Sequence, residues 1–136
     1  MADKASKTGY TEGIGRRKTS IARVRITPGT KVAFEVNEQP VDEYFKTDML
    51  RMIVRRPLTA EGVADKYHVT VHVRGGGIHS QSEAVSLGLA RALCNRETQV
   101  RTVLKQGKLL TSDARQKERR KFGLKKARKS PQWSKR

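Results

Sequence analysis

Residues 67–95 read YHVTVHVRGGGIHSQSEAVSLGLARALCN, and this stretch decides the fold. Its first eight residues alternate apolar and polar side chains, the period of a half-buried strand whose inner face carries Tyr67, Val69, Val71 and Val73. Three glycines end the strand. A capping-box pattern from Ser80 to Glu83 then opens a helix to about Asn95, with apolar side chains at helical spacing. A strand followed directly by such a helix predicts a sheet covered by helices.

The segment before this stretch predicts a β-hairpin. Residues 22–26 alternate apolar side chains with Arg23 and Arg25, which would lie on the outer face. Residues 27–30 read Thr-Pro-Gly-Thr and predict a turn, in which Pro presets φ and Gly takes positive φ. A return strand follows over 31–36, and its inner face would carry Val32, Phe34 and Val36. We therefore expect residues 22–26 to pair with residues 31–36.

Further helices are expected on both sides of the central stretch. Thr47 is a candidate N-cap for a helix that Pro57 stops near Arg55, with an inward face of Met49, Leu50, Ile53 and Val54. A helix over 97–106 would bury Val100, Val103 and Leu104 and end at Gly107, before Leu109 and Leu110 anchor the exit of the chain. The sequence therefore predicts an α+β fold, a small twisted sheet covered by helices.

Composition divides the 136 residues into three parts. Residues 1–12 are polar and small and predict a flexible arm, residues 13–110 have enough apolar content for one globular body, and residues 111–136 form a basic tail. The whole chain has a net charge of +17, and the tail alone holds eleven Lys and Arg against two acids. Its few apolar residues cannot offset the roughly 1–2 kcal/mol per residue needed to order the backbone. We expect the tail to be extended.

So basic a chain indicates a polyanionic partner, and the tail indicates nucleic acid. Arg matches phosphate oxygens with its planar fork, and aromatic side chains interleave with the charge. A solubilising tail, a localisation signal and a contact with anionic lipid are the alternatives. Phe122 and Trp133 are expected to stack on bases or to pack on a protein neighbour. The tail residues predicted to bind RNA are Arg115, Lys117, Arg119, Arg120, Lys121, Lys125, Lys126, Arg128 and Lys129.

Two further candidate RNA contacts lie in the body. Arg16, Arg17 and Lys18 precede the strand that presents Arg23 and Arg25, so these five cations are expected to form one positive ridge. Arg74 and the glycines Gly75, Gly76 and Gly77 stand between a strand and a helix, where backbone amides could approach a phosphate. A plain tight turn is the alternative for the glycines.

The sequence predicts no catalytic or metal site, no cofactor and no small-molecule substrate. His68 and His72 lie four residues apart on one strand, hence ~13 Å apart, too far to share a zinc ion. GIGRRKTS lacks the ending of a phosphate-binding loop and precedes a strand where such a loop needs a helix. Cys94 is the only cysteine and is expected to be a buried, inert thiol. No apolar stretch is long enough for a membrane span.

Three stretches together resemble the bacterial form of ribosomal protein S-nine of the small subunit. They are GIGRRKTSIARV, VHVRGGGIHSQSEAVSLGLARAL and LLTSDARQKERRKFGLKKARKSPQWSKR, and the resemblance runs from about Gly13 to Arg136. It implies the fold of the second domain of ribosomal protein S-five, with a left-handed strand–helix–strand crossover. It also implies binding to the head of the small subunit, in the 3′ major domain of its ribosomal RNA.

The same resemblance implies further partners. The terminal Ser134, Lys135 and Arg136 would approach the tRNA in the peptidyl site, and neighbouring head proteins would be S-seven, S-ten and S-fourteen. The location would be the ribosome, in a bacterial cytoplasm in preference to an organelle. The competing hypothesis is a free nucleic-acid chaperone or DNA-compacting protein, which would use the same charge without a fixed binding site.

Overall fold

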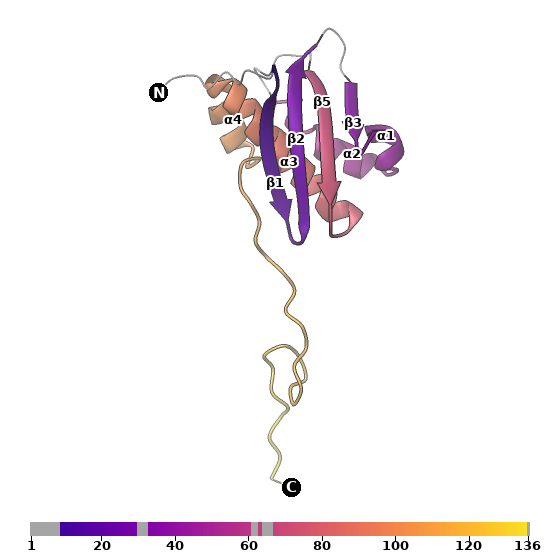
Figure 1. Ribbon diagram of the computed structural model, residues 1–136. Coiled ribbons are helices and arrows are strands. Elements are labelled where there is room, and N and C mark those ends of the chain that lie inside the picture. Colours follow the sequence, from indigo (N-terminus) through magenta and orange to yellow (C-terminus); the bar gives the residue numbers. More distant parts are fainter. Residues whose placement is uncertain (1–8, 30–32, 61–62, 64–66, 136) are drawn as a thin grey trace.

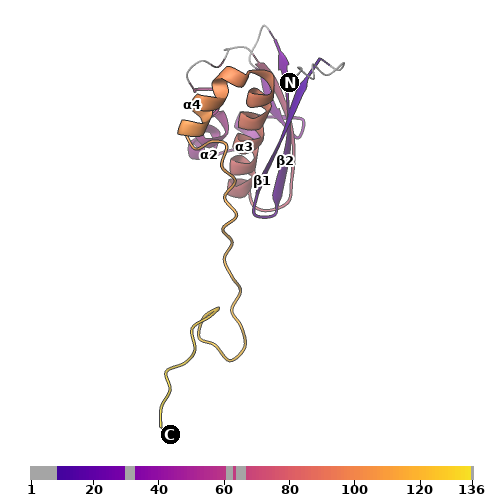
Figure 2. The ribbon, with the colours of Figure 1, turned by 90° about the vertical axis from the view of Figure 1, so that its left-hand side faces the viewer.

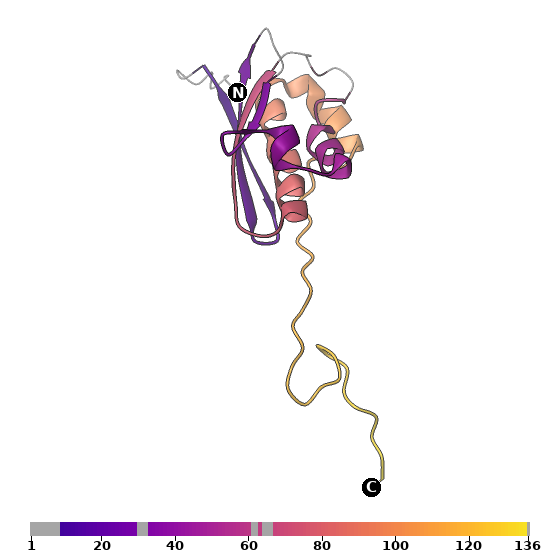
Figure 3. The ribbon, with the colours of Figure 1, turned by 90° about the vertical axis from the view of Figure 1, so that its right-hand side faces the viewer.

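The structure is a computed structural model that describes residues 9–29, 33–60, 63 and 67–135. Its body is a five-stranded sheet in the order β1-β2-β5-β3-β4, with the helices on one face (Figures 1 and 3). The strands are β1 (Thr11–Arg17), β2 (Ser20–Pro28), β3 (Ala33–Val36), β4 (Gln39–Pro40) and β5 (Tyr67–Arg74). The helices are α1 (Val41–Tyr44), α2 (Asp48–Arg55), α3 (Ile78–Arg96), the short 3-10 helix η1 (Thr98–Val100) and α4 (Arg101–Gln106). The predicted α+β class is confirmed.

β5 and α3 form the centre of the body, as residues 67–95 predict. β5 pairs antiparallel with β2 and parallel with β3, and its alternate residues Tyr67, Val69, Val71 and Val73 are all buried. α3 packs against β1, β2 and α2. Because β5 has a partner on each side and a helix layer over its apolar face, residues 67–95 supply about half of the core.

The start of α3 differs from the prediction. The helix begins at Ile78, so Ser80 is its third residue and not the N-cap. The Ser80 hydroxyl accepts from the Gly77 amide at 3.1 Å and donates to the Gly77 carbonyl at 2.8 Å. Gly75 and Gly76 have positive φ, which reverses the chain quickly enough for the helix to start three residues early. Glu83, expected to complete the capping box, instead contacts Arg17.

β1 is a strand that the sequence analysis did not predict. It pairs antiparallel with β2 across its whole length, and it begins at Thr11, inside the range assigned to the flexible arm. Residues 1–8 of that arm lie outside the described residues. Gly13 and Gly15 face α3 so closely that a Cβ on Gly15 would stand 1.9 Å from the Ala84 carbonyl oxygen. The strand lacks the usual apolar alternation because glycines occupy the positions that would otherwise show it.

The predicted pairing of residues 22–26 with residues 31–36 is wrong. β5 lies between β2 and β3, and β3 pairs with β5 in parallel and with β4 antiparallel. The expected inner residues Phe34 and Val36 are buried, whereas Thr30, Lys31 and Val32 lie outside the described residues. The residues of a turn predict where the chain reverses but not which strands pair. Here the valine-rich β5 lies between β2 and β3 and pairs with both. The tight turn of this region is at Asn37 and Glu38, both at positive φ, between β3 and β4.

The smaller helices agree with the sequence in their positions. α2 follows Thr47 and ends at Arg55, two residues before Pro57, and Val54 is fully buried. Met49 is 66% exposed, so its predicted inward position is wrong, whereas the predicted Leu50 and Ile53 are partly buried and Val54 is fully buried. The helix expected over 97–106 is divided into η1 and α4, and it buries Val100 and Leu104.

The chain leaves the body after α4. Leu109 and Leu110 are partly buried against the core, as expected of an exit anchor. Residues 111–135 form no helix or strand and lead away from the body (Figures 1 and 2). Within the described residues, no helix is long and apolar enough to cross a membrane.

Candidate nucleic-acid interface

The face of the sheet opposite the helices carries a row of cations. Strand alternation buries one set of side chains under α3 and turns the other set outward. In the register of the sheet Arg23 stands beside His72 of β5, and Arg25 stands beside Glu12 of β1. The helices lie on the other side (Figure 3). We call this set the open face; its Arg and His residues on the described strands are Arg16, Arg23, Arg25, His68, His72 and Arg74.

One acid and one aromatic ring hold part of the open face in place. Glu12 lies 3.0 Å from Arg25 and 4.0 Å from Arg23, and the Arg25 guanidinium lies 4.6 Å from the centre of the Tyr10 ring. Such contacts reduce the rotamer freedom that Arg must lose on binding. Glu12 and Tyr10 were assigned to the flexible arm, so sequence reasoning missed this role. The net charge of the face remains positive.

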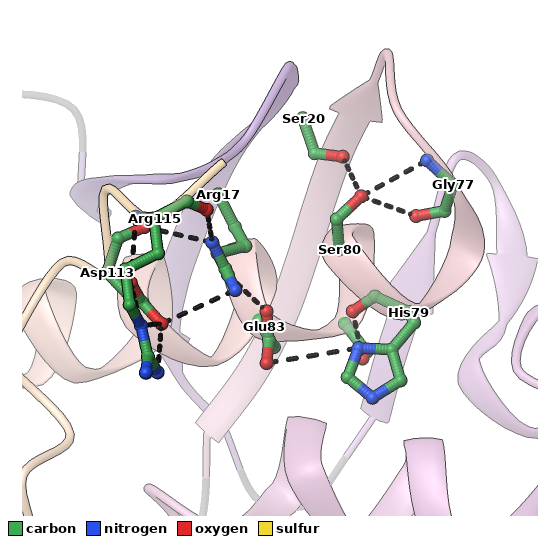
Figure 4. Close-up of polar contacts among 9 residues, drawn as sticks. Arg17, Ser20, Gly77, His79, Ser80, Glu83, Asp113 and Arg115 are labelled. Carbon is green, nitrogen blue, oxygen red and sulfur yellow. Dashed lines mark hydrogen bonds and ion pairs between the residues drawn. The ribbon is translucent and has the colours of Figure 1, made fainter. Parts of the chain in front are cut away.

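Arg17 does not belong to the open face, although its neighbours suggest it. The predicted continuous ridge is wrong at this point, because alternation places Arg16 outside and Arg17 on the α3 side, while Lys18 sits in the β1–β2 turn at positive φ. The Arg17 side chain is only 15% exposed and its Nε donates to Glu83 Oε2 at 2.6 Å. Figure 4 shows it surrounded by residues of α3 and the start of the tail.

The root of the tail, residues 111–115, folds onto Arg17. Nη1 of Arg17 donates to the carbonyl oxygens of Asp113 at 3.2 Å and Arg115 at 2.8 Å. Asp113 in turn accepts from the side chain and the backbone of Arg115. These hydrogen bonds hold the pKa of the Asp113 carboxyl well below its usual range, so it is charged at any pH near neutrality. The sequence predicted only a capping role for Glu83 and no role for Asp113, because their partner Arg17 is distant in the chain.

Close packing within the protein explains the glycines of the turn over 75–77. A Cβ on Gly75 would lie 2.5 Å from the Thr19 carbonyl oxygen, and one on Gly76 would lie 2.1 Å from Ser20 Oγ. The Gly77 amide already donates to Ser80, and Ser20 and Ser80 hydrogen-bond at 2.7 Å (Figure 4). The glycines therefore let two turns of the body pack together, and their predicted approach to a phosphate stays a prediction.

The rest of the tail presents its side chains to solvent. Glu118 accepts from Lys121 at 2.6 Å and Arg128 at 2.8 Å, which closes a loop in the middle of the tail (Figure 1). The same two cations, Lys121 first, lower the pKa of Glu118. Phe122 and Trp133 are 106% and 79% exposed, so both rings are uncovered by the body. The predicted tail cations are exposed over 115–129, and Arg136 lies outside the described residues.

The described residues contain no group of three or more His, Cys, Asp or Glu placed to hold a metal ion. Cys94 is buried as predicted, and burial raises the pKa of its thiol. Throughout the described part of the chain, every buried side-chain nitrogen or oxygen has a hydrogen-bond partner. The interface therefore consists of surface cations and exposed rings, which suit binding of a phosphate backbone and stacking on bases.

Comparison with known proteins gives a consistent result. The family described as ribosomal protein S9/S16 matches residues 15–136, which include the open face, the glycine turn and the tail. The small ribosomal subunit protein uS9 of Chlorobium luteolum is 52% identical over 123 residues, covering 90% of this chain and 95% of the relative. That of Chlorobium limicola is 53% identical over the same shares of the two chains. The protein uS9c of Cyanophora paradoxa is 47% identical over 137 residues and the full length of both chains. The chain thus belongs to the ribosomal protein S9/S16 family and is a structural, non-enzymatic component of the small ribosomal subunit.

Proposed function

We propose that the protein binds small-subunit ribosomal RNA in the head of the subunit, within the 3′ major domain, using its open face and its tail. The observation that carries this proposal is the tail itself: residues 111–135 form no helix or strand, yet their root is fastened to the body. Such a segment can follow an RNA surface while the body fixes where it starts. Each phosphate that a Lys or Arg neutralises releases counterions, so binding is strong and depends steeply on salt.

The end of the tail contacts tRNA in the peptidyl site, through Ser134, Lys135 and Arg136. From Arg115 to the end of the tail there are about 22 residues, and at ~3.3 Å each they reach at most ~70 Å from the body. Two exposed rings at Phe122 and Trp133 supply stacking platforms along the way. The contact is electrostatic and positional, with no chemical step.

The proposal includes the assembly around the chain. The neighbouring proteins are S-seven, S-ten and S-fourteen, and the ribosome is bacterial. The crossover from β3 through α1 and α2 to β5 is left-handed, as in the second domain of ribosomal protein S-five. The body is residues 13–110 with the tail from 111, and β1 extends the body to Thr11.

Shortening the tail tests its role. Small subunits reconstituted with the chain lacking residues 130–136 are expected to assemble normally and to release peptidyl-site tRNA about tenfold faster, since charge-assisted contacts are lost. Replacing Lys125 and Lys126 by Gln is the matched control, because it also removes two positive charges, but from a position farther from the end of the tail. Equal tRNA release rates for the truncated and full-length chains, over a range of magnesium concentrations, would contradict the proposed tRNA contact.

The competing hypothesis of a free nucleic-acid chaperone is tested separately. A ribosomal component is expected to prefer a folded fragment of small-subunit RNA to random RNA of the same length at raised salt. Equal affinities for the two RNAs would favour the chaperone, because purely electrostatic binding does not distinguish them.

A further inference from the structure

We propose that Arg17 is a positioning residue that latches the root of the tail to α3, and that it does not contact RNA. The sequence groups Arg17 with Arg16 and Lys18 as an RNA-binding cluster. The structure separates it from them, since its side chain passes to the helix side of the sheet and ends between Glu83 and residues 113–115 (Figure 4). The consequences for RNA and for tRNA rest on the proposed function above, whereas the contact of Arg17 with the root of the tail does not.

The contacts of Arg17 use most of its donors. Nε donates to Glu83, Nη1 donates to two backbone carbonyls of the tail, and Nη2 lies 3.4 Å from Asp113 Oδ2. A guanidinium has five N–H donors in a fixed fork. With each of its three nitrogens engaged and the side chain 15% exposed, little of the fork remains for a phosphate.

The latch joins three distant parts of the chain. Arg17 is 66 residues from Glu83 and 98 residues from Arg115. Glu83 is on α3, and its other carboxylate oxygen lies 3.8 Å from His79 Nδ1. On the tail side, Asp113 accepts from the Arg115 backbone and side chain at 2.8 to 3.1 Å, so the two carbonyls are presented together. The tail leaves the body in one fixed direction.

Charge explains why a basic tail needs such a latch. The body and the tail are both strongly positive, and like charges in close contact repel. Within the latch, Glu83 and Asp113 pair with Arg17 and Arg115, so the charges of these four residues balance. The tail can therefore start flat against the body, and its positive charge accumulates only beyond Arg115.

Mobility of the root in the free, full-length chain tests the latch directly. In Arg17→Gln, the backbone order parameters of residues 112–115, measured by ¹⁵N relaxation, are expected to fall from about 0.8 to below about 0.6. Arg16→Gln, which alters the adjacent cation on the open face, is the matched control and is expected to leave them unchanged. Asp113→Asn removes an acceptor in the tail and changes no residue of the body. It is expected to loosen the root too, which keeps the test valid if Arg17→Gln also weakens the fold.

Arg17→Lys tests whether the guanidinium geometry is needed or the positive charge is enough, because Lys keeps the charge and lacks the planar group of donors. Lys cannot reach the carboxylate and two carbonyls at once, so it is expected to loosen the root as Gln does. Order parameters that stay high in Arg17→Gln and Asp113→Asn alike would overturn the latch.

The salt dependence of RNA binding separates a latch from an RNA contact. With a fragment of small-subunit RNA, Arg16→Gln is expected to reduce the slope of log K against log salt by about 0.7–0.9, the value for one lost phosphate contact. Arg17→Gln is expected to leave the slope unchanged. A slope reduced by Arg17→Gln as much as by Arg16→Gln, with an ordered root, would show that Arg17 binds RNA and would overturn the proposal.

The functional consequence is measured in reconstituted small subunits. A loose root spreads the tail over more orientations and lowers its effective concentration at the tRNA, so Arg17→Gln is expected to speed tRNA release about two- to threefold. If truncation of residues 130–136 speeds release but Arg17→Gln does not, the positioning role is wrong and the tail function stands. If truncation has no effect, the tail function fails, while the order parameters still decide the latch.

Discussion

The contact between β1 and α3 predicts that a single methyl group at Gly15 is strongly destabilising. A Cβ at this position would stand 1.9 Å from the Ala84 carbonyl oxygen and 2.5 Å from the Gly88 amide nitrogen. Ordinary contacts of a Cβ are 3.4 Å or longer, so β1 and α3 must separate by about 1.5 Å. Both obstructing atoms are backbone, and no side-chain rotation can relieve the overlap.

The expected cost of Gly15→Ala follows from this geometry. Overpacking in a well-packed core costs about 1–3 kcal/mol, and the upper end applies where the backbone itself must move. A loss of about 3 kcal/mol lowers the Tm of a body of about 100 residues by roughly 12 to 20 °C. Urea and thermal unfolding of the full-length chain, followed by circular dichroism, measure both values.

Gly77→Ala is the matched control for this substitution. A Cβ at Gly77 meets nothing within 4 Å, and its φ of −102° is open to any residue. Loss of backbone freedom in the unfolded chain favours Ala by about 0.4–1 kcal/mol, and the poorer N-cap opposes this by a similar amount. We expect little net change. A Gly15→Ala variant as stable as Gly77→Ala would refute the close β1–α3 packing on which the position of the open face depends.

Three further predictions concern the core, the pH dependence and the open face. Leu104→Ala, which empties a fully buried site, should cost about 2–5 kcal/mol in urea unfolding, whereas Met52→Ala, on a side chain 71% exposed, should change stability by less than about 0.5 kcal/mol. Burial and the hydrogen bond to Glu97 raise the pKa of Tyr67 to about 12, so the folded state keeps this proton more tightly than the unfolded state. The stabilising contribution of the Tyr67 hydroxyl is complete below about pH 10, the usual pKa of Tyr, and is lost as pH rises towards 12. Unfolding experiments over this range should therefore show a shrinking difference in stability between the parent and Tyr67→Phe. Glu12→Gln should tighten binding to small-subunit RNA in a salt titration, because it frees Arg25 and Arg23 from their acid; weaker binding would mean that Glu12 serves mainly to orient them.

The candidate site was predictable in its composition but only partly in its arrangement. The cations and exposed rings of the tail follow from a run of charge with few apolar residues, because such a segment cannot pack in any fold. Arg23 and Arg25 face outward as strand alternation requires. Arg17 was misplaced, since three adjacent basic residues look alike in sequence and only strand β1 sends the middle one to the opposite face.

The sequence by itself determined the features that depend on near neighbours. It gave the limits of β5, the end of α2 before Pro57, the burial of Cys94 and the basic character of the tail, because propensity, alternation and charge density act over a few residues. Tertiary structure decided which strands pair and how closely elements approach. β5 separates β2 from β3, and Gly13 and Gly15 form a strand without an apolar pattern because α3 lies against their backbone. Those choices depend on packing between residues far apart in the chain, and a local pattern carries no record of a distant partner.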